Sequence, residues 1–182
     1  MPIISSDIKI RLSVKSGSAG NSLAQADVNA SLGKYISTTD ITTAVANNLF
    51  DNVTGAENAA SAVEYRCIFV YNSHGSITLE NAGIYISSQV AGGSVLAIAV
   101  DNVAASAIGG SSAQAFEATD STTSPGGSAG SFSSPSSSGA ALALGSIPAG
   151  FCKAVWVRRT AANTGAVDAD GGTLVVLGDT SA

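Results

Sequence analysis

Two short Ser motifs in the chain resemble nucleophile motifs. Residues 126–130 read GGSAG, which matches G-x-S-x-G around Ser128, and residues 31–34 read SLGK, which matches S-x-x-K. The first motif works at a sharp strand-to-helix turn, with an acid and then a His later in the chain; the second needs S-D-N and K-T-G elements. The single His, His74, precedes Ser128, and the S-D-N and K-T-G elements are absent. We therefore interpret both motifs as chance matches and predict no catalytic residues and no enzyme.

The remaining candidate groups are one His, two Cys and a pair of Asp residues. His74 lies in a polar NSHGS turn and is expected to be an exposed hairpin residue. Cys67 and Cys152 are far apart in sequence, which favours reduced, half-buried strand residues over a disulfide and cannot supply the four ligands of a zinc site. The DADGG segment, with Asp168 and Asp170, begins like a calcium loop but lacks the later Glu. We expect a turn stabilised by Asp side chains, with a bound cation as the alternative, and no cofactor.

Charge and hydropathy exclude further classes of function. The 182 residues carry a net charge of −5, and only 12% of them are charged, against about 25% in an average soluble domain. Three of the eight basic residues cluster at Lys9, Arg11 and Lys15, which is no phosphate-neutralising face, so we expect no nucleic-acid partner. No apolar run approaches the ~20 residues that cross a bilayer, and the N-terminus has no secretory signal pattern. We expect no membrane partner and synthesis in a cytoplasm.

The elements that would position any site are strands. Residues 7–15 alternate apolar and polar side chains, which predicts a strand with one buried face. Residues 62–72 are apolar on both faces, which is typical of a central strand. Residues 150–160 are expected to form another strand with apolar side chains on both faces. Further strands are expected within residues 77–88, 92–101 and 173–179, and residues 51–58 are expected to form a turn or loop. Within residues 62–72, one face is expected to carry Ile68 and Val70 and the other Tyr65, Cys67, Phe69 and Tyr71. Within residues 150–160, Val155 and Val157 are expected on one face and Trp156 on the other.

These patterns predict an all-β fold of seven to nine strands, a single antiparallel β-sandwich with a long Ser/Gly-rich loop. Residues 105–140 are rich in Ser, Ala and Gly, and the part of the chain after them is too short to build its own core. We therefore expect one domain over residues 1–182, with residues 1–6 as an N-terminal arm and 105–140 as an excursion within the domain. Phe132 within it is expected to anchor an ordered loop.

Three blocks of sequence carry a resemblance to a known family. They read NASLGKYIS, NLFDNVTGAENAASAVEYRCIFVYN and LGSIPAGFCKAVWVRRTAANTGAVDADGGTLVVLGDT. This pattern, from about residue 29 to the C-terminus, resembles tailed-bacteriophage virion structural proteins. The resemblance implies an immunoglobulin-like β-sandwich in a virion assembled in the host cytoplasm. It also implies the major capsid protein or other virion proteins as partners, and carries over no functional site.

The function expected from these observations is non-enzymatic. A capsid decoration or cement protein that stabilises the head by protein–protein contacts fits the low charge, and the chain is expected to form a homo-oligomer in the particle. The alternatives are a neck, collar, tail or baseplate component and a carbohydrate-binding adhesion module. The aromatic side chains Phe132, Trp156, Tyr65 and Tyr71 are the interface candidates, unless loops of the same chain cover them.

Overall fold

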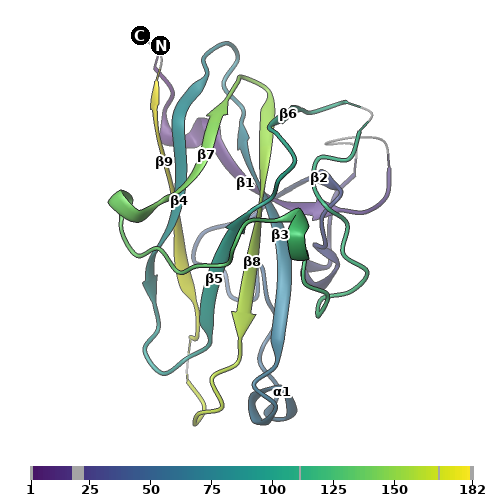
Figure 1. The fold of residues 1–182 in the computed structure, drawn as a ribbon, viewed down its shortest axis with the longest axis vertical. Helices are drawn as coiled ribbons and strands as arrows, with labels where there is room; N and C mark the ends of the chain where they lie inside the picture. Colours follow the sequence, from purple (N-terminus) through teal and green to yellow (C-terminus); the bar gives the residue numbers. More distant parts are fainter. Residues whose placement is uncertain (1, 18–22, 111, 168, 181–182) are drawn as a thin grey trace.

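Nearly all regular structure in the chain is antiparallel β-strand. The computed structural model describes residues 2–17, 23–110, 112–167 and 169–180. Within these residues there are nine strands and one short α-helix, α1 (Gly55–Ala59) (Figure 1). Four 3-10 turns are also present, at Ser5–Asp7, Val28–Ala30, Gly126–Ser128 and Ser138–Ala140. The strands are β1 (Ile8–Val14), β2 (Tyr35–Asp40), β3 (Val63–Asn72), β4 (Leu79–Gln89), β5 (Val95–Val100), β6 (Ser106–Ala107), β7 (Leu142–Ile147), β8 (Phe151–Thr160) and β9 (Gly172–Thr180). The prediction of an all-β chain with antiparallel pairing is confirmed.

The strands form a large sheet and a small one. The large sheet has the order β2-β1-β3-β8-β5, with β6 also paired to β8, and it curls like half a barrel. The small sheet has the order β7-β4-β9. The central β3–β8 ladder joins strands that are far apart in sequence and runs without a shift from Val63–Thr160 to Tyr71–Cys152.

Strand periodicity divides the core into two clusters, and the faces predicted within each of the two strands are confirmed. The side chains of Ile68 and Val70 on β3 and of Val155 and Val157 on β8 face the small sheet. There they pack against Leu79, Ala82, Ile84, Ile86, Leu144 and Ile147, and each of these side chains is at least 95% buried. The opposite faces of β3 and β8 carry Cys67, Phe69, Tyr71, Cys152 and Trp156, which belong to the second cluster.

The second cluster is covered by chain that is largely irregular. We call residues 101–135 the covering segment. Its side chains Ala115, Ala118 and Ala129 are buried against the outer face of the large sheet. Figure 1 shows the later part of this segment crossing in front of β8 and β5 before the chain enters β7. The described residues between 105 and 140 thus contact the large sheet, to which β5 before them and β8 after them both belong.

Two sequence expectations differ from the structure. The prediction of a turn or loop over residues 51–58 is wrong where α1 begins, at Gly55. Thr54 accepts a hydrogen bond from the Glu57 amide, and Glu57 Oε2 accepts one from the Thr54 amide. This reciprocal cap nucleates a single helical turn. Strand β7 was not expected, because LALGSI follows the Ser/Gly stretch and contains Gly145 at a φ of +77°.

Candidate functional site

Asp101 lies at the centre of the contacts between the covering segment and the large sheet. Its side chain is buried, and Oδ2 accepts hydrogen bonds from the Trp156 indole nitrogen at 2.9 Å and from the Phe116 amide at 3.0 Å. Oδ1 accepts a third hydrogen bond from the Val103 amide at 2.9 Å. One carboxylate therefore joins strand β8 to two separate parts of the covering segment, and hydrogen bonding compensates for its burial.

Lys153 of β8 binds the main chain of the same residues, Asp101 to Val103. Its ammonium donates to the main-chain oxygens of Asp101 at 2.7 Å and Val103. Burial lowers the pKa of Lys153, against the opposing attraction of Asp101. Because both oxygens lie just after the end of β5 at Val100, Lys153 fixes where the covering segment leaves the sheet.

Gln114 provides a further buried link. Its side-chain oxygen accepts from the Ile36 amide at 3.0 Å, and its nitrogen donates to the Ala107 carbonyl at 3.2 Å and lies 3.2 Å from Cys152 Sγ. Burial raises the pKa of the Cys152 thiol to about 12 and that of the Cys67 thiol well above its usual value. Both cysteines are free and buried, so the thiols are protonated and unreactive at neutral pH.

The Ser/Gly stretch from residue 124 to 139 is bound through its main chain. Ser133 exchanges two backbone hydrogen bonds with Ile98 of β5, at 2.7 and 3.0 Å, and Gly130 donates to the Val100 carbonyl at 2.9 Å. The Pro135 carbonyl then accepts from the Ile86 amide of β4 at 2.8 Å. The stretch therefore covers the edge of β5 and crosses from the large sheet to the small one.

Of the four interface candidates, two are enclosed by their own chain. Trp156 is 0% exposed and Tyr71 is 8% exposed. For Trp156 the cover comes from the covering segment, where Phe116 lies at a ring-centroid distance of 6.3 Å. The indole therefore presents no surface to a partner, which matches the alternative that loops of the same chain cover these rings.

The other two candidates, Phe132 and Tyr65, contact each other. Their ring centroids are 5.4 Å apart in an edge-to-face arrangement, and the Arg158 guanidinium lies 5.3 Å from the Phe132 centroid. Both rings are only partly buried. Phe132 is thus packed against the large sheet, while part of each ring stays accessible on the outer surface.

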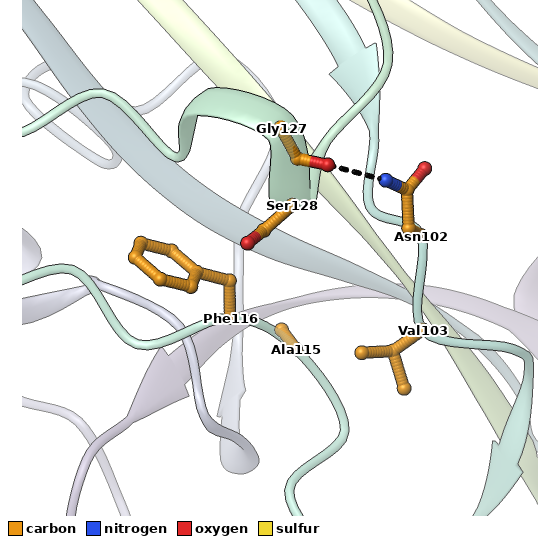
Figure 2. A pocket seen from close by; sticks show the side chains of 6 residues that line it. All are labelled: Asn102, Val103, Ala115, Phe116, Gly127 and Ser128. Atoms are coloured by element: carbon orange, nitrogen blue, oxygen red, sulfur yellow. Dashed lines mark hydrogen bonds between the residues drawn. The ribbon is translucent and has the colours of Figure 1, made fainter.

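The covering segment also encloses a shallow hollow of about 480 Å³. Figure 2 shows the hollow, with the Ser128 hydroxyl directed toward Phe116 and the Asn102 amide bonded to the Gly127 carbonyl at 2.7 Å. Val103 and Ala115 complete the lining. The lining has no charged side chain. The hollow therefore presents two polar side chains, Asn102 and Ser128, but no group that could act as an acid or a base.

The residues singled out for chemistry have structural partners. His74 is half-buried rather than exposed as expected, because its Nδ1 accepts hydrogen bonds from the Ser76 and Ile77 amides at 3.1 and 3.0 Å. Ser31 is buried and donates to the Cys67 carbonyl at 2.7 Å. Asp170 accepts from the Ser94 amide at 2.8 Å, which ties its turn to the start of β5.

The cation alternative at Asp168 and Asp170 concerns one residue, Asp168, that lies outside the described residues. Among the residues that the structure does describe, no three His, Cys, Asp or Glu side chains are grouped closely enough to hold a metal ion. No helix in the described ranges is both long and apolar enough to span a bilayer.

Sequence reasoning missed the buried polar residues Asp101, Gln114 and Lys153. A signal was present for two of them. Asp101 ends the apolar run VLAIAV, and Lys153 interrupts the apolar strand FCKAVWV. A charged residue inside or directly after a run of this kind needs buried partners, since an unpaired charge is costly there.

A comparison with protein-family models, with curated proteins and with solved structures gives no match to this chain.

Proposed function

We propose that this protein is a structural component of a tailed-phage particle that decorates the head and strengthens it by protein–protein contacts. We further propose that its two packed sheets are an elaborated immunoglobulin-like β-sandwich, in which the covering segment adds a third layer. The sequence blocks that resemble virion structural proteins support this function. Strands β3 and β8, which carry two of these blocks, form the centre of the large sheet.

The observation that carries the proposal is the ordered, nearly uncharged surface of the covering segment. Between residues 105 and 140 the only charged residues are Glu117 and Asp120. Exposed Ser residues such as Ser131 and Ser136 lie beside a main chain already fixed to β5 and β4. A prearranged surface loses little conformational entropy on binding, and the cores of protein interfaces are depleted of charge.

The test is binding to heads of the phage that carries this chain, assembled without it. The wild-type protein is expected to bind these heads and raise their temperature of disruption. Replacing Ser131 and Ser136 together by Glu places two charges on the surface of the Ser/Gly stretch and should weaken binding at least tenfold. Thr43→Glu, at an exposed position on another loop, is the matched control and should bind like the wild type.

Three outcomes of this test contradict the proposal. The first is no binding of the wild-type protein, and the second is no gain in the heat resistance of the heads. The third is equal binding by the variant with Glu at 131 and 136 and by Thr43→Glu. Counting copies per particle separates decoration from the ring-forming alternative. Hundreds of copies support a shell position, whereas about six or twelve support a neck, tail or baseplate ring.

A further inference from the structure

Strand β9 is an exposed edge of the small sheet. Among the described elements it pairs with β4 alone. The four central side chains, from Leu174 to Leu177, are all apolar and all only half-buried. Leu174 and Val176 face the core between the sheets, so Val175 and Leu177 point to the outer face of the small sheet. The strand is therefore apolar on both faces.

The pairing of β4 with β9 shows which N–H and C=O groups of β9 point away from β4. Ile86 of β4 lies opposite Leu174, but its amide donates to Pro135 on the far side of β4. In an antiparallel ladder this makes Ile86–Leu174 a non-hydrogen-bonded pair, and the register continues unshifted to Ile84–Val176. The N–H and C=O groups of Leu174 and Val176 therefore point away from β4, toward the free edge.

The other edge strands, β2, β5 and β7, are covered or interrupted by described residues of the same chain, whereas β9 is not. The Ser/Gly stretch covers β5, and the Leu23 carbonyl accepts from the Thr38 amide of β2. On the third edge, β7 is interrupted at Gly145 by a positive φ and a register shift. Strand β9 contains no Lys and no Pro, the residues with which proteins usually protect an exposed edge. An unprotected edge of this length favours pairing with another strand.

We propose that β9 pairs antiparallel with β9 of a second copy of this chain, which joins the two small sheets across a two-fold axis. The strand is self-complementary. An axis through Val176, the middle of Gly172–Thr180, pairs the outward main-chain groups of Val176 with those of the second copy. It also places the single charge of the strand, Asp179, opposite Thr173 of the other copy, so the two carboxylates lie at opposite ends.

The first experiment measures the mass of the full chain by sedimentation velocity between about 1 and 200 μM. The wild type is expected to form a dimer with a dissociation constant on the order of micromolar, because strand pairing alone buries a small interface. Val176→Pro removes an N–H that points to the free edge, which edge strands tolerate. It should give a monomer with an unchanged far-ultraviolet circular dichroism spectrum. Val95→Lys, at an exposed apolar position of β5, should leave the dimer unchanged.

The second experiment tests the register with charges. Thr173 is exposed. Thr173→Asp places a carboxylate opposite Asp179 of the other copy and should weaken the dimer at least tenfold, whereas Thr173→Lys should keep or tighten it. This pair decides the question even where Val176→Pro fails to fold.

A wild-type chain that stays monomeric up to 200 μM overturns the proposal. So does a dimer that is equally strong with Asp and with Lys at position 173. The pairing goes beyond the proposed function, since a monomer that still binds phage heads would refute the pairing and leave the decoration role intact.

Discussion

Asp101→Asn is the most informative single substitution, because it keeps the shape of the side chain and removes its charge. The carboxylate accepts three hydrogen bonds, from the Trp156 indole and from the Phe116 and Val103 amides. An Asn side chain has one acceptor oxygen and one NH2 group. In either orientation the NH2 group faces at least one N–H that has lost its acceptor.

The magnitude follows from the better orientation, in which the Asn oxygen keeps the indole and Phe116 bonds. The lost bond to Val103 costs about 1.5–3 kcal/mol, since it involved a charged acceptor. The two remaining bonds become neutral and roughly half as strong, which removes about 1 kcal/mol more. We expect the free energy of unfolding to fall by about 2.5–4 kcal/mol, a large share of the roughly 5–15 kcal/mol typical of a domain.

The assay is urea unfolding followed by fluorescence. The chain has a single Trp, and that residue, Trp156, is itself a partner of Asp101. With a urea dependence of about 2 kcal/mol per molar, the urea midpoint should fall by about 1.2–2 M. Asp120→Asn is the matched control. Asp120 is an exposed carboxylate of the covering segment. It caps a turn through Thr122 and Thr123, and Asn can cap that turn as well.

The reasoning is refuted if Asp101→Asn lowers the free energy of unfolding by less than about 1 kcal/mol, or by no more than the control does. Either result would mean that the covering segment is held by its apolar contacts and main-chain bonds, and that the buried carboxylate contributes little.

Three further predictions concern other contacts of the same region. Gly33→Ala should cost more than about 3 kcal/mol in urea unfolding, because a Cβ there would lie 1.9 Å from a main-chain oxygen at a φ of +90°. Gly109→Ala, at a φ of +88° with open space around it, isolates the backbone strain and should cost about 1 kcal/mol; equal losses would contradict the close approach. Burial raises the pKa of the Cys152 thiol to about 12 in the native state, whereas the thiol of the unfolded chain ionises near pH 9. The native state is therefore at its most stable, with respect to this group, below pH 9. Its free energy of unfolding declines as the pH rises from 9 toward 12. Cys152→Ser should therefore reduce the slope of stability between pH 9 and 11 by about 1.4 kcal/mol per pH unit, and an unchanged slope would count against burial of the thiol. Phe132→Ala should cost about 1–2 kcal/mol and speed thermolysin cleavage of the Ser/Gly stretch; unchanged cleavage would show that the ring does not hold the stretch.

The strands and their faces could be predicted from sequence because a strand alternates its side chains with a period of two. Ile68 and Val70 separate from Cys67 and Phe69 in the structure as that period requires. The same pattern says that both faces of β3 and β8 need cover, but it does not say what provides it. Whether Trp156 meets a partner or its own chain depends on long-range packing, which periodicity does not encode.

The ordered surface of the Ser/Gly stretch was harder to predict, because main-chain atoms make its contacts with β5 and β4. Ser133 and Pro135 bond to β5 and β4 through backbone groups that every sequence possesses, so a Ser/Gly composition looks the same in an ordered edge and in a flexible linker. Side-chain chemistry gave clearer signals that were present in the sequence. The Thr54–Glu57 spacing is a helix-capping pattern, and the charge of Lys153 within an apolar strand indicates buried acceptors.

The β3–β8 ladder has a consequence for how the chain folds during synthesis. Cys67 of β3 pairs with Trp156 of β8, so about 90 further residues must be made before the centre of the large sheet can close. At about 5–20 residues per second this takes about 4–18 s. Over that time the apolar faces of β3 have only β1 as an available strand partner. The nascent chain should therefore be a chaperone client, and slowing translation between residues 72 and 151 should increase its aggregation.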